Sequence, residues 1–306
     1  MILVVGQPNG VFYHRLQVPY EDLLMRGFAV KFGTIADLDQ LKGHITHLVV
    51  NRGLATKDHN KFKALLRKYD IKFIVDLDDW WNLPTDHVNK SLAKGTQILN
   101  SLKIADEIHT TNEYLAEKIQ KINPYVPIYI LPNAIDPRRE QWTTDKTTEE
   151  LSIGYLGALY HDYDLEWNEI DLSPYNSYSL QFYQQAIGAT HAFAPRDYNN
   201  YGELYKQVDV SIAPLAPTEF NRCKSNLKAL EAGFTKTCII AQKMHPYTPL
   251  LNDSNSILCR TPSDWREALA SITKEKAQEL AENLYHDVQF FDIENINNTR
   301  QECFVK

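Results

Sequence analysis

Short apolar runs alternate with longer amphipathic segments along almost the whole chain. In the first half, the runs MILVVG, FAVKFGT, HITHLVVN, KFIVDLDD, EIHTTN and VPIYIL have the length and composition of buried strands. Between them lie segments with helical periodicity, such as FYHRLQVPYEDLLMRG, which ends at Gly27, and TKDHNKFKALLRKYD, for which we expect Thr56 as the N-cap. Strands separated by helices of about 10 to 15 residues form βαβ units with a parallel sheet. The pattern therefore predicts the α/β class.

A second α/β series follows a break in the pattern. The polar, threonine-rich stretch WTTDKTTEE has no apolar period and is the expected linker. With 306 residues the chain has room for two domains of about 150 residues each. We expect doubly wound, Rossmann-like domains over residues 1–142 and 150–286, and a final helix over 287–306 that packs back on the first domain through Phe304 and Val305. Ligands of such sheets bind outside the carboxyl ends of the strands, so the interdomain cleft is the expected site.

Composition excludes several classes of protein. No apolar run reaches the roughly 18 residues of a membrane span, and the N-terminus reads as a strand rather than a signal peptide. The four cysteines show no metal-ligand spacing and indicate reduced thiols in a cytoplasm. The net charge of −7 argues against a general polyanion binder, although residues 1–140 carry 18 basic and 16 acidic side chains.

The stretch FNRCKSNLKALEAG, residues 220–233, follows the apolar strand VDVSIAPL. We expect its helix to begin at Ser225, a favourable N-cap residue. Free backbone N–H groups and the helix dipole there suit a phosphate, and Lys224 adds a positive charge. Glu231, almost two turns on, suits the hydroxyl groups of a sugar. The combination describes a nucleoside diphosphate with its ribose, whereas the alternative is a capped helix with solvated Lys224 and Glu231.

With the residues that follow it, this stretch resembles the nucleotide-sugar site of GT-B glycosyltransferases, in particular a large retaining group of bacterial enzymes. Those enzymes carry two glutamates eight residues apart, the second of which holds the donor ribose. Glu231 matches the second glutamate, but Cys223 stands at the first. The Lys-Ser-Asn-Leu-Lys sequence resembles a compact subgroup from bacteria and their viruses. The resemblance implies that Lys224, Ser225 and Asn226 hold the diphosphate.

Further parts of the resemblance are spread along the chain. LPNAID (131–136) and ADEIHTTNEYLAEKI (105–119) are similar to the end of the first GT-B domain, and IGYLGALYHDYDL (153–165) to the first strand and loop of the donor domain. The resemblance implies a UDP-sugar co-substrate, no cofactor, no metal and transfer with retention. The other donor-binding candidates are Gly154, Gly157, His161, Asp164, Ala194 and Asn221.

The acceptor side is expected in the first domain. NGVFYHRLQVP resembles the loop that faces the donor, so Tyr13 and Arg15 are expected to bind the acceptor and His14 to act in catalysis. FIVDLDDWWNLP adds Asp78 and Asp79 as catalytic candidates and Trp80 as a stacking surface. Clustered carboxylates that include Asp76 could instead bind Mg²⁺, or they could cap the following turn.

The nature of the acceptor stays open between a glycan, a lipid-linked sugar, a protein and a DNA base. A DNA acceptor is suggested by basic side chains expected around one helix, namely Lys57, Lys61, Lys63, Arg67, Lys68 and Lys72. A solvated lysine-rich helix, or a face that rests on anionic lipid, explains them equally. A catalytically inactive nucleotide-binding relative is a further alternative, because Cys223 replaces a family glutamate. A dehydrogenase is disfavoured, since GQPNG stands where GxGxxG is required.

Overall fold

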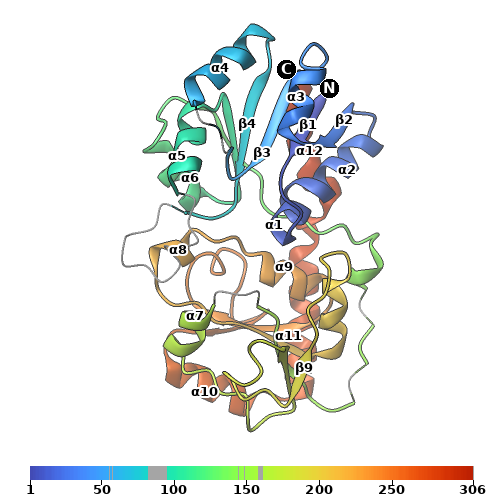
Figure 1. The fold of residues 1–306 in the computed structure, drawn as a ribbon. Helices are drawn as coiled ribbons and strands as arrows, with labels where there is room; N and C mark the ends of the chain where they lie inside the picture. Colours follow the sequence, from blue (N-terminus) through green and yellow to red (C-terminus); the bar gives the residue numbers. More distant parts are fainter. Residues whose placement is uncertain are drawn as a thin grey trace. The chain divides into compact units, whose positions relative to one another are not determined.

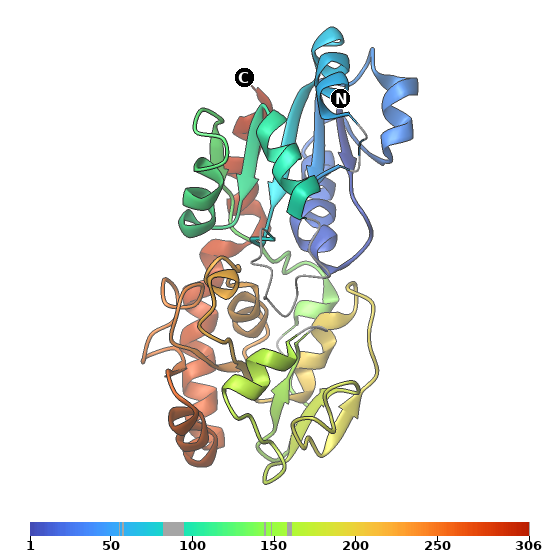
Figure 2. The same cartoon turned by 60° about the vertical axis from the view of Figure 1, so that its left-hand side comes forward.

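The computed structural model describes residues 1–54, 56, 58–81, 95–143, 145–147, 149–157 and 161–305. The chain divides into two compact units. Unit 1 comprises residues 1–134, 223–225 and 293–306, and unit 2 comprises residues 135–222 and 226–292. Both chain ends lie at the same end of unit 1 (Figures 1 and 2).

Unit 1 contains, within the described residues, one six-stranded sheet in the order β2-β1-β3-β4-β5-β6, and every pair of neighbouring strands is parallel. Its strands are β1 (Ile2–Val5), β2 (Val30–Gly33), β3 (His47–Asn51), β4 (Lys72–Leu77), β5 (Glu107–Thr110) and β6 (Ile128–Ile130). Its helices are α1 (Gly10–Phe12), the π-helix η1 (Tyr13–Gln17), α2 (Val18–Met25), α3 (Ile35–Leu41), α4 (His59–Lys68), α5 (Gly95–Ile104), α6 (Glu113–Gln120) and α12 (Ile293–Val305).

Alternate side chains of these strands enter two different apolar clusters. Leu3 and Val75 belong to one cluster, whereas Ile2, Val4 and Ile74 belong to the other. Because successive side chains of a strand point to opposite faces, both faces of the sheet are buried, as the near-continuous apolar runs require. The α/β class predicted from the sequence is confirmed.

Three local features of unit 1 differ from expectation. The first helix widens into the π-helix η1, in which the Val18 N–H donates to the Tyr13 carbonyl five residues back. The α3 helix was missed, although Thr34 and Asp37 form a capping box at its start. The N-cap of α4 is Asp58 rather than Thr56, since its carboxylate accepts the first free N–H groups of the helix.

The C-terminal helix α12, red in Figure 1, packs against α2 within unit 1. Asn297 is fully buried, and its Nδ2 donates to the Pro19 carbonyl at 2.8 Å and to Asp22 Oδ2 at 2.9 Å. The Phe304 ring meets the Tyr20 ring edge to face, with centroids 5.9 Å apart. Polar bonds and aromatic packing thus both hold the last helix.

Unit 2 repeats the architecture. Its described residues form one six-stranded parallel sheet in the order β12-β11-β10-β7-β8-β9. The strands are β7 (Ile153–Tyr155), β8 (Ser177–Leu180), β9 (His191–Phe193), β10 (Val210–Ala213), β11 (Cys238–Gln242) and β12 (Ile257–Cys259). The α-helices are α7 (Asp162–Trp167), α8 (Glu219–Arg222), α9 (Leu227–Phe234), α10 (Pro262–Ser271) and α11 (Lys274–Val288), and the 3₁₀ helices are η3 (Glu140–Trp142), η4 (Tyr201–Gln207) and η5 (Gln289–Phe291).

The described residues of the threonine-rich stretch, expected as a linker, belong to unit 2 and are bonded within it. Lys146 Nζ donates to the carbonyls of Tyr205 at 2.8 Å and Val208 at 2.9 Å, and the Thr147 hydroxyl donates to the Lys206 carbonyl at 3.3 Å. Burial lowers the pKa of Lys146 to about 7. All four cysteines are buried thiols without disulfide bonds. No helix of the described chain combines the length and the apolar character needed to cross a bilayer.

Candidate functional site

The order of strands in unit 2 defines where a ligand is expected. From β7 the chain passes to β8 and β9 on one side and later to β10, β11 and β12 on the other. In open parallel sheets the ligand crevice lies at the carboxyl ends of the two strands where the order reverses. Here those strands are β7 and β10. The segments that follow them, with α7, α8 and α9, hold most of the predicted donor-binding residues.

Asp164 joins the two segments. Its Oδ1 accepts the Ala216 N–H at 2.8 Å and the Asn221 Nδ2 at 2.6 Å, and its Oδ2 lies 2.7 Å from His161 Nδ1. The carboxylate accepts from the ring, so Nδ1 carries a proton and Nε2 remains for other partners. Three predicted residues, His161, Asp164 and Asn221, are thus brought together.

Glu231 on α9 is the second centre. The residue is 2% exposed, and its Oε2 accepts from both Tyr205 OH and Lys228 Nζ at 2.8 Å. The Lys228 ammonium also bonds Tyr201 OH at 2.7 Å and lies 4.6 Å from the centroid of that ring. Burial acts to lower the pKa of Lys228, but the Glu231 carboxylate outweighs it and holds the pKa above its ordinary value.

Sequence reasoning missed Lys228, Tyr201 and Tyr205. The sequence did contain a signal for Lys228, because a lysine three residues before a glutamate lies on the same face of a helix. The tyrosines gave no such signal, since Tyr205 and Glu231 are 26 positions apart.

The expected start of the helix at Ser225 is wrong. The α9 helix begins at Leu227, after Asn226, whose side chain makes no capping bond. Ser225 Oγ instead accepts from Asn133 Nδ2 at 2.8 Å, and the Lys224 carbonyl accepts from Asn112 Nδ2 at 3.1 Å. These bonds explain why residues 223–225 belong to unit 1 whereas the helix that follows belongs to unit 2.

The remaining donor candidates have simple surroundings. Gly154 lies inside β7, where an added Cβ would come within 2.6 Å of Val208 Cγ1. An added Cβ at Gly157 would collide with the Tyr155 ring. Ala194 is exposed directly after β9. Packing therefore favours glycine at positions 154 and 157, independently of any contact with a ligand.

In unit 1, η1 holds three predicted acceptor-side residues, Tyr13, His14 and Arg15, and all three are buried. The Arg15 guanidinium donates two hydrogen bonds to the Asp76 carboxylate, at 2.9 and 2.8 Å. Its Nη1 also donates to the Leu131 carbonyl at 2.7 Å. Arg15 is 1% exposed, and the bonds to Asp76 and Leu131 give this guanidinium a structural role inside the unit.

The other acceptor-side residues follow β4. Arg52, which the sequence reading missed, donates to both Asp78 oxygens at 3.0 and 3.1 Å and lies 3.5 Å from Asp79. Burial by itself would raise the pKa of Asp78, but the Arg52 guanidinium outweighs it and lowers the pKa below its ordinary value. Trp80 is only 8% exposed and packs in the apolar core.

The basic side chains expected around one helix are distributed differently. Lys61 is exposed on α4, but Lys63 Nζ donates to the Ile104 carbonyl at 2.8 Å. Lys72 lies on β4, not on the helix, and pairs with Glu107 at 2.6 Å. Lys57 lies outside the described residues.

One buried group with metal-ligand spacing occurs among the described residues, formed by Glu107, His109 and Cys303. His109 Nε2 lies 2.8 Å from Glu107 Oε1, and Lys72 Nζ donates a hydrogen bond to Glu107 Oε2. Because the lysine already balances the Glu107 charge, the residues present do not favour a cation there.

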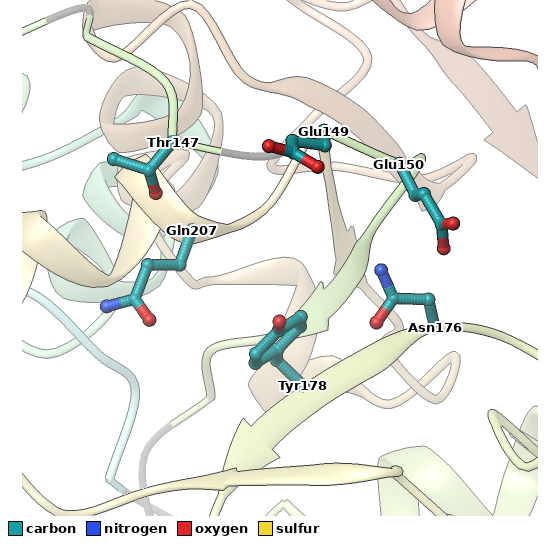
Figure 3. Close-up of a pocket in the computed structure, with 6 residues that line it drawn as sticks. All are labelled: Thr147, Glu149, Glu150, Asn176, Tyr178 and Gln207. Carbon is teal, nitrogen blue, oxygen red and sulfur yellow. The ribbon is translucent and has the colours of Figure 1, made fainter.

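A polar hollow of about 300 Å³ opens at the opposite end of unit 2 (Figure 3). The residues that line it lie before β7, before β10 and at the start of β8, and they are Thr147, Glu149, Glu150, Asn176, Tyr178 and Gln207. It faces the amino ends of the strands, and none of the predicted site residues lines it.

No family model and no curated protein sequence matches the chain. Solved structures do match it over almost its whole length. A glycosyltransferase from Rickettsia africae superposes with a TM-score of 0.66 at 11% identity, over 99% of this chain and 97% of that one. Anabaena HepE, solved with UDP-glucose, gives 0.65 at 14% identity, over 99% and 98%. The chain has the GT-B fold.

A third GT-B structure supports the same assignment. The UDP-forming α,α-trehalose-phosphate synthase from Burkholderia vietnamiensis superposes with a TM-score of 0.53 at 11% identity, over 84% of this chain and 72% of that one. The two Rossmann-like units predicted from the sequence are therefore the two halves of a GT-B protein.

Proposed function

We propose that this protein is a glycosyltransferase that moves a sugar from a nucleoside diphosphate sugar to an acceptor hydroxyl. The observation that carries the proposal is the buried Glu231 carboxylate at the carboxyl edge of the second sheet, in a chain with the GT-B fold. HepE has been solved with UDP and with UDP-glucose, which supports UDP as the nucleotide.

On the donor side, Glu231 accepts hydrogen bonds from the ribose hydroxyls. The His161, Asp164 and Asn221 group lies at the same sheet edge and orients the donor sugar through His161. Lys224, Ser225 and Asn226 bind the diphosphate, and backbone groups at Gly154, Gly157 and Ala194 approach the nucleotide. The reaction breaks the bond between the anomeric carbon and the diphosphate and forms the bond to the acceptor oxygen, with retention.

On the acceptor side, His14 is the best candidate for a base, because Arg52 already neutralises Asp78 and contacts Asp79. A positioned base contributes about 10²–10⁴-fold to such a step. Tyr13 lines the same segment. We assign no metal, because Asp76 and Asp78 are each bonded by a guanidinium.

The acceptor is a glycan, a lipid-linked sugar or a protein rather than a DNA base. Trp80, the expected stacking surface for a flipped base, is packed in the core, and Lys72 is paired. Binding of hydroxymethylated DNA at low salt that weakens in a Lys61→Glu, Lys68→Glu variant would reverse this choice, since phosphate contacts release counterions.

The test of the function is a thermal-shift screen across nucleotide sugars, followed by an assay for slow donor hydrolysis. A ligand present at 100 times its Kd adds about 2.7 kcal/mol to the stability of the folded protein. We expect a UDP-sugar to raise the melting temperature and to release UDP. Binding without any release would identify an inactive relative, and no response to any nucleotide sugar would reject the proposal.

A further inference from the structure

We infer that Lys228 is a positioning residue for the donor nucleotide: its ammonium holds the Glu231 carboxylate in one orientation, and Tyr201 ties this pair to the end of β7. The inference rests on the proposed function, because it assigns Glu231 to the nucleotide. Lys228 was not among the residues expected at the site, and it touches the ligand only through Glu231.

The first step of the argument is the geometry of the carboxylate. Lys228 Nζ and Tyr205 OH both bond Oε2 of Glu231 at 2.8 Å. Two donors on one oxygen fix the plane of the carboxylate, and they direct its second oxygen away from themselves. A ribose hydroxyl pair needs such a fixed acceptor, because hydrogen bonds weaken steeply when their angles are poor.

The second step is the link to the rest of the site. Tyr201 OH accepts from Lys228 Nζ at 2.7 Å and donates to the Leu156 carbonyl, directly before Gly157. The network therefore joins α9, η4 and the end of β7, the elements that border the carboxyl edge of the sheet. Displacement of Lys228 would release its bonds to both Glu231 and Tyr201.

The third step is a comparison with an ordinary helical ion pair. Lys276 and Glu279 on α11 have the same spacing in sequence and a contact of 3.0 Å, but their side chains are 48% and 61% exposed. The side chains of Lys228 and Glu231 are 28% and 2% exposed. Exposed pairs contribute little to stability. In contrast, removal of one partner of a buried pair leaves the other charge without compensation.

The experiment is a calorimetric titration with UDP at pH 7.5 for the wild type, Lys228→Met, Lys228→Arg and the matched control Lys276→Met. We expect Lys228→Met to raise the Kd at least about tenfold, the loss typical of a charged hydrogen bond. Lys228→Arg keeps a cation beside Glu231, so it should recover most of the lost affinity. Lys276→Met should match the wild type.

A second variant protects the test against misfolding. Tyr201→Phe keeps the ring but removes the bonds to Lys228 and Leu156, so it should weaken UDP binding about threefold or more. If the wild type binds UDP but the Kd of Lys228→Met stays within twofold of the wild-type value, the inference is overturned and the proposed function is not. Tyr201→Phe decides in the same way if Lys228→Met does not fold. A wild type that binds no nucleoside diphosphate overturns the proposed function and this inference with it.

Discussion

At the scale of single residues, Glu231 is the side chain on which donor binding should depend most. Glu231→Gln keeps the shape but removes the charge, so the hydroxyl groups of the ribose lose a charged acceptor. We expect UDP affinity to fall about 10- to 150-fold, as for hydrogen bonds of roughly 1.5–3 kcal/mol. Calorimetry on this variant and on Glu279→Gln, its exposed counterpart on α11, measures the difference. Affinity within threefold of the wild type would remove Glu231 from the site.

The ion pair of Arg52 with the buried Asp78 gives a prediction for the dependence of stability on pH. The pKa of Asp78 is lowered because Arg52 outweighs the effect of burial, so the unfolded chain binds a proton at Asp78 more readily than the folded protein. This stabilisation is fully present above about pH 4, the unfolded value, and is lost as the pH falls through the lowered pKa.

Asp78→Asn has no such titration, so its free energy of unfolding should change less than that of the wild type between pH 5 and pH 3. Urea unfolding at each pH measures this change. The control is Asp39→Asn, because Asp39 is 75% exposed and its contact with Lys42 is 3.9 Å. Equal slopes for Asp78→Asn and the wild type would show that Arg52 does not stabilise the charged form.

At the scale of elements, the packing of β7 requires a residue without a side chain at position 154. A Cβ at Gly154 would lie 2.6 Å from Val208 Cγ1, and both residues are buried. Gly154→Ala should cost about 1–3 kcal/mol of stability, the usual effect of overpacking. Val208→Ala removes the obstructing methyl groups, so the double variant should lose less than the sum of the two single variants. If the losses in the free energy of unfolding are additive in urea unfolding, Val208 is not what opposes a side chain at position 154.

The same scale decides the role of α12. Truncation after Asp292 removes Asn297 and Arg300, which are fully buried, and leaves the bridge between Ile135 and Asp292 intact. We expect a large fall in melting temperature, because α2 loses the helix packed against it and the Asp22 carboxylate loses the bond from Asn297. Removal of the last two residues is the control, since Val305 is 73% exposed. An unchanged melting temperature after the longer truncation would make α12 a dispensable tail.

At the scale of the whole molecule, turnover should not depend on a divalent metal. The carboxylates that could serve as ligands in unit 1 are already bonded by arginines, Asp76 by Arg15 and Asp78 by Arg52. Preorganised protein cations and backbone dipoles can stabilise a leaving diphosphate instead. UDP-sugar hydrolysis or transfer in excess EDTA should stay within about twofold of its rate with Mg²⁺. Complete loss, restored by Mg²⁺ or Mn²⁺, would assign Asp76, Asp78 and Asp79 to a metal.

The sequence by itself determined the class of the fold, and it predicted the region of the candidate site. Apolar runs and helical periodicity are local signals that extend over about ten consecutive residues. They were therefore sufficient to predict two parallel sheets and the helix that carries Glu231. Gly27 was likewise identifiable as the end of a helix, and its φ is 92°.

The tertiary structure alone decided which polar groups meet. Arg15 and Asp76 lie 61 positions apart, Asn133 and Ser225 lie 92 apart, and Tyr205 and Glu231 lie 26 apart. A local sequence pattern does not report such distant pairs, so it predicts Ser225 as a helix cap and gives no sign of the bond between Arg52 and Asp78. A buried charge or hydroxyl must find its partner wherever the packed chain brings one. Folding, rather than spacing in sequence, therefore assigned these side chains their roles.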